Sequence, residues 1–348
     1  MAHGTGQITQ ERTDPPGTRG GAGPEVFIRP DAFTPVGRPA LRRGERGWLE
    51  RVELITPAMC GNNSLFVGQL GDWTWDAVGS ACGIDPYTAV DDEGNPVYLS
   101  FAYFRVRSAT GLCAEDLTFG DRLRVRSKVM SSGGDSLLTV HRATLASSSS
   151  PAEPDGSADD VESFFGYRAP QTIHVENFNR WIQRSGHGTN HGLRPATPAG
   201  FRTAHLPVVP DRHTPRRTWA SARRNVGFRT EAEPPARATL NLDYQVNASR
   251  DLNGVGLLYF ASYFSIVDWA VLSLWRSLQR PASAFLSRRV LDRQLCFIAN
   301  ANAEDVLGVQ ISTFSDTDGT DVVDVAVRRA DGDLLAVARQ RLQHPTPC

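Results

Sequence analysis

Two short segments of the chain combine glycine with amide and hydroxyl side chains just before a long apolar pattern. They run Met59-Cys60-Gly61-Asn62-Asn63-Ser64 and Asp251-Leu252-Asn253-Gly254-Val255-Gly256. Asparagine and serine are preferred caps at the start of a helix, and glycine allows close approach to the backbone. The unpaired N–H groups of a helix that begins there can stabilise negative charge on a ligand oxygen. The same residues also occur as ordinary caps and turns, and both interpretations stay open.

The histidines and the paired carboxylates give no comparable site. His141 lies in a strand pattern, where a half-exposed structural residue is favoured over a general base. His187 and His191 have i,i+4 spacing, but the glycines around them predict a loop rather than the helix that would align them for a metal. Asp72 and Asp76 would share a helix face, which we interpret as solvated or structural. We therefore expect no metal, and no glycine-rich phosphate motif suggests an organic cofactor.

The composition is that of a folded, water-soluble protein. The 348 residues allow two domains of ordinary size, and hydrophobic and charged residues make up 40% and 22% of the chain. A net charge of -1 argues against nucleic acid as a partner. The five cysteines are scattered without a C-x-x-C pair, so neither a disulfide framework nor a zinc site is indicated. Because we find no secretory signal and no run of roughly 18 apolar residues, we expect a cytoplasmic protein without a membrane partner.

The periodicity predicts a similar order of elements in the two halves of the chain. The first half is predicted to contain a helix over 64–82 and strands over 97–107, 122–130 and 136–145. The second half is predicted to contain a strand over 239–246, a helix over 256–277 and strands over 288–298, 306–314, 321–329 and 334–341. Between them, the Ser/Pro/acidic stretch 147–160 predicts a loop or linker, 173–190 predicts helix at first, and 197–235 predicts a crossing connection.

An internal duplication explains the repeated order. Adding 193 to positions in the first half carries Gly61 onto Gly254 and superposes the two predicted helices. A long apolar helix followed by antiparallel strands is buried most economically by a sheet that curls around it. That arrangement is the hot-dog fold, whose turn-and-strand segment residues 117–125 resemble. We expect an α+β double hot-dog, with a flexible leader (1–46), an N-terminal hot-dog (47–170), a connecting segment (171–236) and a C-terminal hot-dog (237–343).

Four stretches carry a more specific resemblance. They are residues 56–82, PVYLSFAYFRVR (96–107), VENFNRW (175–181) and RDLNGVGLLYFASYFSIVD (250–268). Together they resemble the bifunctional acyltransferase/decarboxylases of leinamycin-type polyketide biosynthesis, from about Trp48 to Arg341. The resemblance implies decarboxylation of methylmalonyl-CoA, or a related alkylmalonyl-CoA, and transfer of the propionyl group to an acyl carrier protein. It implies no cofactor, since the coenzyme A thioester is the substrate.

The missing histidines agree with this chemistry. Hot-dog thioesterases have His-Val-Asn after the glycine at the helix start, whereas Val255-Gly256-Leu257 follow Gly254 here. Hot-dog dehydratases use a histidine with a carboxylate, and neither helix start contains a histidine. Decarboxylation needs no such base, because it leaves an enolate that a helix N-terminus can stabilise. A hot-dog thioesterase or dehydratase, or a non-catalytic acyl-thioester binding protein, stays as the alternative.

The resemblance also implies a tyrosine of the first half as acyl acceptor. Tyr98 is favoured because it lies early in a strand beside the helix, whereas Tyr87 follows Asp85-Pro86 in a predicted loop. Tyr103 shares strand parity with Phe101, opposite to Tyr98. A packed strand aromatic is the alternative for Tyr98. Because a phenol titrates near pH 10, hydrogen-bond donation is an easier role for it than nucleophilic attack.

The predicted site therefore has a catalytic and a binding part. Its catalytic residues are Tyr98, Asn62 and Ser64, and its substrate-binding residues are Met59, Cys60, Gly61, Asn63, Asn253, Gly254, Arg216 and Arg217. The two arginines belong to the basic stretch 212–224, which could bind the phosphates of coenzyme A or the acidic surface of a carrier protein. A solvated connection fits that stretch equally well. A homodimer, and the use of one or both hot-dog pockets, stay open.

Overall fold

The computed structural model describes residues 40–60, 65–108, 111–146, 161–167, 169–186, 189–230, 233–315 and 320–343. The chain divides between Arg38 and Pro39, and every element below belongs to the unit that starts at Pro39. Most of the expected leader and all of the stretch 147–160 lie outside the described residues. Within the described ranges, no helix is both long enough and apolar enough to cross a membrane.

Two long helices occupy the centre of the molecule, as the periodicity predicts. α1 (Leu65–Cys82) and α4 (Phe260–Ser277) each contain 18 residues. Along α1, Phe66, Leu70 and Trp73 recur at helical spacing and are buried, which explains why this segment forms a helix against a core. The shorter helices are α2 (Val161–Phe165), α3 (Pro215–Asn225), α5 (Ala282–Leu286) and the 3-10 helices η2 (Glu45–Gly47), η3 (Pro57–Met59), η4 (Ala114–Asp116) and η5 (Asp211–His213).

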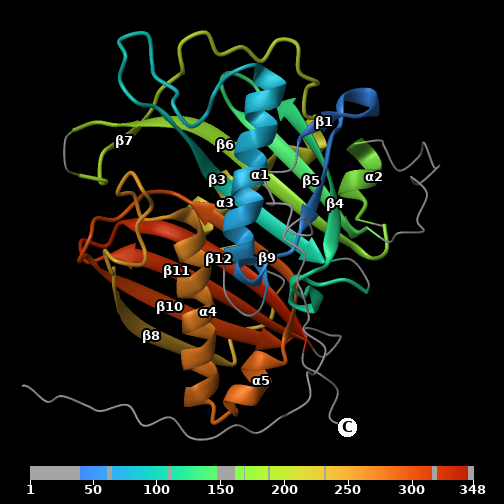
Figure 1. The fold of residues 1–348 in the computed structure, drawn as a ribbon. Coiled ribbons are helices and arrows are strands. Elements are labelled where there is room, and N and C mark those ends of the chain that lie inside the picture. The colour runs from blue at the N-terminus through green and yellow to red at the C-terminus, as the bar shows by residue number, and fades with distance from the viewer. Residues whose placement is uncertain are drawn as a thin grey trace, which may run out of the picture. The chain divides into compact units, whose positions relative to one another are not determined.

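The strands form one continuous antiparallel sheet in the order β1-β2-β4-β5-β6-β3-β9-β12-β11-β10-β8, with β7 beside β6 (Figure 1). Their bounds are β1 (Arg42–Arg43), β2 (Leu49–Leu54), β3 (Tyr98–Ser108), β4 (Arg122–Ser131), β5 (Leu137–Leu145), β6 (Thr172–Arg184), β7 (Leu193–Pro195), β8 (Ala238–Gln245), β9 (Arg289–Phe297), β10 (Val306–Ser315), β11 (Asp321–Arg329) and β12 (Leu334–Gln343). Inward from the edges, the halves read β2-β4-β5-β6-β3 and β8-β10-β11-β12-β9. This equivalent topology confirms the predicted repetition of the element order and the double hot-dog.

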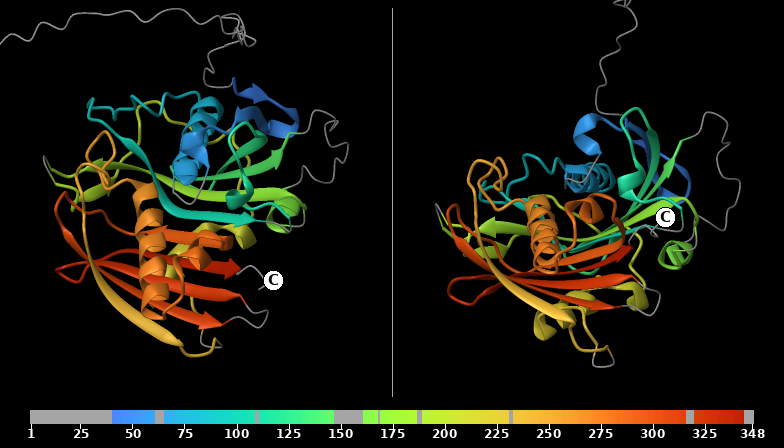
Figure 2. Two further views of the ribbon diagram at one scale, coloured as in Figure 1. Left: turned by 60° about the horizontal axis from the view of Figure 1, so that its bottom comes forward. Right: turned by 90° about the horizontal axis from the view of Figure 1, so that it is seen from below.

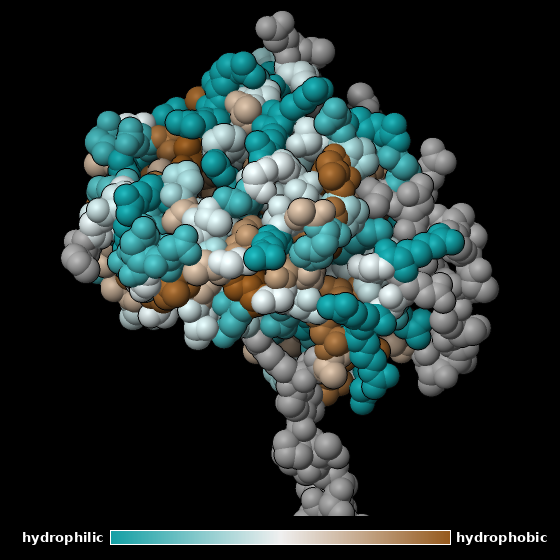
Figure 3. Space-filling model, turned by 90° about the horizontal axis from the view of Figure 1, so that it is seen from above, coloured by the Kyte–Doolittle hydropathy of each residue, from teal (hydrophilic) through white to brown (hydrophobic). Residues whose placement is uncertain are grey.

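The two central helices lie on one face of the sheet and α3 lies on the other (Figures 1 and 2). Leu70 of α1 and Val267 of α4 share a buried cluster with Phe104 of β3. The preceding strand residue, Tyr103, packs with Ala222 of α3 in a separate cluster. The sheet is therefore covered on both faces along the seam where the halves meet. On the surface shown in Figure 3, apolar side chains lie in separate spots among polar ones.

The prediction of helix at the start of residues 173–190 is wrong, because this segment forms β6. Val175, Phe178 and Trp181 recur at the three-residue spacing of a helix face. In the fold, β6 pairs with β5 on one side and β3 on the other, and most of its residues are buried. Its polar side chains reach buried partners, as Asn177 does by donating to Thr74 Oγ1. The sheet of the N-terminal half thus includes β6, and the segment expected to be a connection also contains α3.

Candidate functional site

The seam between the two halves opens into a cavity of about 630 Å³. β3 and β9 pair from Tyr103–Cys296 to Arg107–Asp292. Beyond Tyr103 and Cys296, residues 98–102 and 297–300 line the two sides of the cavity. Gly71 and Trp75 of α1 line it on one face of the sheet, and Trp219 of α3 lines it on the other. The cavity therefore reaches both faces of the sheet.

A hydrogen-bonded loop brings the start of α4 to the cavity. Asn253 Oδ1 accepts from the N–H groups of Val255 (3.2 Å) and Leu257 (3.0 Å), and this turn holds residues 253–257 in place. Because residues 253–257 form this turn, α4 starts at Phe260, whereas the sequence predicts its start at Gly256. Tyr259 is the N-cap residue, no side chain caps this end, and both Tyr259 and Phe260 line the cavity. The N–H of Ser262 donates to the backbone oxygen of Tyr259 (2.9 Å), whereas the N–H groups of Phe260 and Ala261 have no partner among the described residues and are available next to the cavity.

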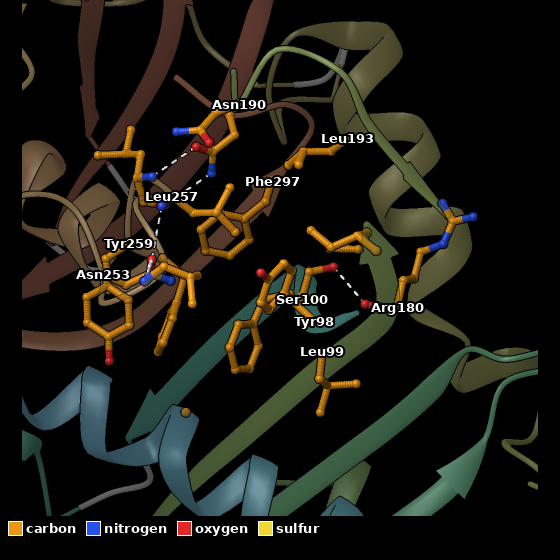
Figure 4. Close-up of a pocket in the computed structure, with 18 of the residues that line it drawn as sticks. Tyr98, Leu99, Ser100, Arg180, Asn190, Leu193, Asn253, Leu257, Tyr259 and Phe297 are labelled. Atoms are coloured by element: carbon orange, nitrogen blue, oxygen red, sulfur yellow. Dashed lines mark hydrogen bonds between the residues drawn. The ribbon is translucent and has the colours of Figure 1, made fainter. Parts of the chain in front are cut away.

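Several polar side chains that line the cavity have donor groups without a partner among the described residues. Among the described residues, no hydrogen bond or ion pair involves the hydroxyl of Tyr98, Nδ2 of Asn253 or the guanidinium of Arg180. In Figure 4, Tyr98 and Ser100 lie between Asn253 and Tyr259 on one side and Arg180 on the other. Such donors can bind the oxygens of a ligand, and they become stronger partners when an oxygen gains negative charge.

Aromatic side chains close the cavity next to the start of α4. The ring of Phe260 lies 4.3 Å from that of Phe101 and 5.6 Å from that of Phe104, between ring centroids. Gly71 of α1 faces this ring, and a Cβ at Gly71 would lie closer than van der Waals contact to Cζ of Phe260. The glycine therefore makes room for the aromatic wall. Burial, together with the nearby carboxylate of Asp72, raises the pKa of Tyr259, so its phenol stays protonated.

The structure separates the three candidate tyrosines. Tyr98 is half-buried and lines the cavity. Tyr87 also lines it, but its hydroxyl donates to Asp76 Oδ1 (2.9 Å). Tyr103 is 2% exposed and donates to Gln294 Oε1 (3.1 Å), and burial raises the pKa of this phenol well above its usual value.

The expected parity of Tyr103 is wrong because a β-bulge interrupts β3. The register with β6 shifts between Phe101 and Tyr103, so Ala102 is an extra residue. Ala102 and Tyr103 both pack in the cluster on the α3 side, whereas Phe101 packs on the side of α1 and α4. The alternation of the strand before the bulge places Tyr98 on the same side as Tyr103.

The remaining predicted residues divide into three groups. Asn253 and Gly254 line the cavity. Met59 and Cys60 precede α1, and Arg216 and Arg217 lie on α3; none of these four belongs to the lining. Gly61, Asn62, Asn63 and Ser64 lie outside the described residues.

Asp76 and His141, which the sequence indicates to be structural, form hydrogen bonds with specific partners. Asp76 accepts from Arg51 (2.8 Å) and from Tyr87, so this carboxylate is structural. His141 is fully buried rather than half-exposed, with Nε2 2.9 Å from Thr74 Oγ1 and Nδ1 2.7 Å from Ser127 Oγ. Burial lowers the pKa of His141 to about 3, so the ring is neutral and structural.

The sequence reasoning missed several residues of the cavity. Arg180 is not predicted because the start of β6 is interpreted as helix, although Arg180 shares the two-residue spacing of a strand face with Phe178 and Ile182. His191 lies in a loop, as predicted, and also lines the cavity, with Nε2 3.1 Å from Asp305 Oδ2, whereas His187 lies outside the described residues. The partner of His191 comes from the other half of the chain, so no local pattern could reveal the pair. Within the described parts of the chain, no cluster of His, Cys, Asp and Glu is suited to hold a metal ion.

The chain can now be placed among known proteins. A family model described as the LnmK N-terminal Hot Dog Fold domain matches residues 50–230, which is more than half of the chain. The chain belongs to this family. The part that matches the LnmK model contains β3, β6 and α3, and thus Tyr98, Arg180 and Trp219 of the cavity. No curated protein sequence matches the chain.

Solved structures share the fold of this LnmK-family protein. One is a 12:0-ACP thioesterase from Umbellularia californica, with 11% identity and a TM-score of 0.51 over 86% of this chain and 94% of that chain. Another is described as an oleoyl thioesterase from Lactobacillus plantarum, with 10% identity and a TM-score of 0.52 over 86% of this chain and 96% of that chain. At such low identity the likeness concerns the fold alone, and it agrees with the double hot-dog.

Proposed function

We propose that the protein decarboxylates methylmalonyl-CoA, or a related alkylmalonyl-CoA, and transfers the propionyl group to an acyl carrier protein. The observation that supports this most directly is the group of unpartnered donors at the start of α4, in a chain that belongs to the LnmK family. The thioester oxygen would lie against Asn253 Nδ2 and the first turn of α4. Tyr98, which lies between Asn253 and Arg180, would reach the same oxygen or the carboxylate from the middle of the cavity.

The chemistry needs donors more than it needs a base. Breaking the bond between the α-carbon and the carboxylate releases carbon dioxide and moves an electron pair onto the thioester as an enolate. Donors that face the thioester oxygen gain strength as this charge develops, so they lower the barrier. The enolate takes a proton at the α-carbon and becomes a propionyl thioester. The carrier protein's thiol then attacks the carbonyl, and coenzyme A leaves as the thiol.

Mass spectrometry of the products tests the proposal. The full-length protein is incubated with methylmalonyl-CoA and a phosphopantetheinylated carrier protein. We expect carbon dioxide, free coenzyme A and a propionyl group on the carrier. A non-catalytic binding protein would leave the thioester intact, and that result would refute the proposal.

Thioester hydrolysis is a second candidate, because His191 and Asp305 supply the kind of pair that neither helix start contains. His191 lines the cavity, and a carboxylate partner can orient an imidazole as a general base. A hydrolase would release free methylmalonate and coenzyme A without carbon dioxide. His191→Gln would then abolish hydrolysis, whereas a decarboxylase would retain carbon dioxide release in this variant.

A further inference from the structure

Among the described residues, three arginines on the α3 side of the sheet, Arg180, Arg216 and Arg217, form no ion pair. Arg180 is half-buried and lines the cavity, and its guanidinium has neither an ion pair nor a hydrogen bond among the described residues. Arg216 donates to a neutral backbone oxygen, that of Gly133, and Arg217 is exposed. Within the described ranges, neither Arg216 nor Arg217 forms an ion pair. This part of the surface therefore has uncompensated positive charge that favours an anion.

Strand alternation places Arg180 at the α3 side of the cavity. Phe178, two residues earlier on β6, packs in the same buried cluster as Ala222 of α3. The guanidinium of Arg216 lies 5.8 Å from the centre of the Phe178 ring, on that same face. In Figure 4, Arg180 lies across the cavity from Asn253 and Tyr259. The cationic end and the end at the start of α4 are thus opposite ends of the cavity.

The two ends suit the two ends of a carrier-bound acyl group. The end at α4 combines oxygen-binding donors with an aromatic wall, which suits a thioester and a short apolar chain. The carboxylate of a malonyl group is only two carbon atoms from the thioester carbonyl, so it must lie near Asn253 rather than across the cavity. The anion nearest the other end of the substrate is a phosphate of the carrier arm. A planar guanidinium suits such a group.

We propose that Arg180 binds a phosphate of the thioester's carrier arm, either in coenzyme A or in the phosphopantetheine of an acyl carrier protein. This inference rests on the proposed function for the kind of substrate. It adds the direction in which the substrate lies: the phosphate at the α3 side and the acyl group at the start of α4.

Calorimetric titration of the full-length protein tests the inference without relying on turnover. The ligands are coenzyme A, 4′-phosphopantetheine and pantetheine, which lacks the phosphate. Arg180→Gln is expected to weaken coenzyme A binding by about 10-fold to 100-fold, the scale of one hydrogen bond to a charged group. Pantetheine binding should be unchanged. An equal loss for phosphopantetheine assigns the contact to the phosphate that both carriers share, and a loss for coenzyme A alone assigns it to the nucleotide phosphates.

Arg276→Gln is the matched control, because Arg276 is exposed in the last turn of α4, at the end opposite to the cavity. Its coenzyme A binding should equal that of the wild type. The inference is overturned if Arg180→Gln leaves all three ligands unchanged, weakens pantetheine equally, or if the wild-type protein binds neither phosphorylated ligand. Carbon dioxide release from methylmalonyl N-acetylcysteamine thioester, which carries no phosphate, shows separately whether the proposed function holds.

Discussion

Tyr98 is the residue at which hydrogen-bond donation and covalent acyl transfer can be told apart. If Tyr98 only donates, Tyr98→Phe should slow decarboxylation by roughly 10²-fold to 10³-fold, the effect of losing one oxyanion donor. If Tyr98 carries the acyl group, propionyl transfer should stop and a covalent propionyl mass on the wild-type protein should be missing from the variant. Stopped-flow kinetics and intact-protein mass spectrometry measure the two effects.

Tyr103→Phe provides the control for Tyr98→Phe, because Tyr103 is buried and bonded to Gln294. Tyr103→Phe should leave the rates of decarboxylation and of propionyl transfer nearly unchanged. Wild-type rates in Tyr98→Phe would exclude both roles, and attention would turn to Tyr87.

The neutral state of His141 makes stability depend on pH. Burial lowers the pKa of His141 to about 3 in the folded protein, whereas an unfolded histidine titrates near 6.5. Between these values the unfolded chain binds one more proton, so the free energy of unfolding falls as the pH falls. The contribution is at most about 1.4 kcal/mol per pH unit. Urea denaturation at pH 7 and pH 5 should show this loss, and His141→Gln should have a smaller slope; equal slopes would contradict the assignment.

At the scale of elements, the sequence predicted the two long helices and eight of the twelve strands, but not the environment of each element. The apolar spacing in residues 65–82 and 260–277 is strong because each helix packs one broad face on the core. β6 was misread because it is buried on both faces, and its polar side chains find partners on other elements. Tyr98 is predicted as a site residue because its strand, β3, is recognised from the sequence. Arg180 is not predicted, because its strand, β6, is not recognised.

The contact between Gly71 of α1 and Phe260 of α4 should set the size of the acyl group. Gly71→Ala forces the ring of Phe260 out of an aromatic cluster, and we expect a loss of about 1–3 kcal/mol in stability, offset by up to about 1 kcal/mol of helix propensity.

Phe260→Leu should enlarge the cavity and raise the preference for longer alkylmalonyl thioesters by roughly 10-fold. Thermal denaturation and kcat/KM for a series of chain lengths measure these effects.

The double variant gives the control for this contact. With Phe260→Leu already present, Gly71→Ala should lose much of its cost, because residues in contact are not additive. A fully additive pair would show that the two residues do not interact in the way the structure indicates.

At the scale of the molecule, ion pairs support the seam at the end opposite to the cavity. Glu115 of the N-terminal half contacts Arg293 (3.4 Å), and Asp268 of α4 contacts both Arg293 (3.8 Å) and Arg288 (3.4 Å). Asp268→Asn removes the carboxylate that faces both buried arginines, so we expect a loss of up to about 3–5 kcal/mol in urea denaturation. Because the cavity lies at the other end, activity per folded molecule should be retained.

Asp331→Asn is the corresponding control, since Asp331 pairs with Arg329 but its side chain is 56% exposed. It should cost less than about 1 kcal/mol. An equal loss of stability in Asp268→Asn and Asp331→Asn would argue against a special role for the ion pairs at the seam.

Joining two hot-dog units in one chain removes a constraint that a symmetric dimer cannot escape. In a dimer of identical subunits, each substitution occurs twice, so both ends of the seam must have the same residues. Here β3 and β9 meet in one polypeptide, and the two ends of the seam differ. One end is an aromatic-walled cavity with unpartnered donors, and the other is joined by ion pairs. Two hot-dog units in one chain can therefore have an open cavity at one end of their interface and stabilising ion pairs at the other.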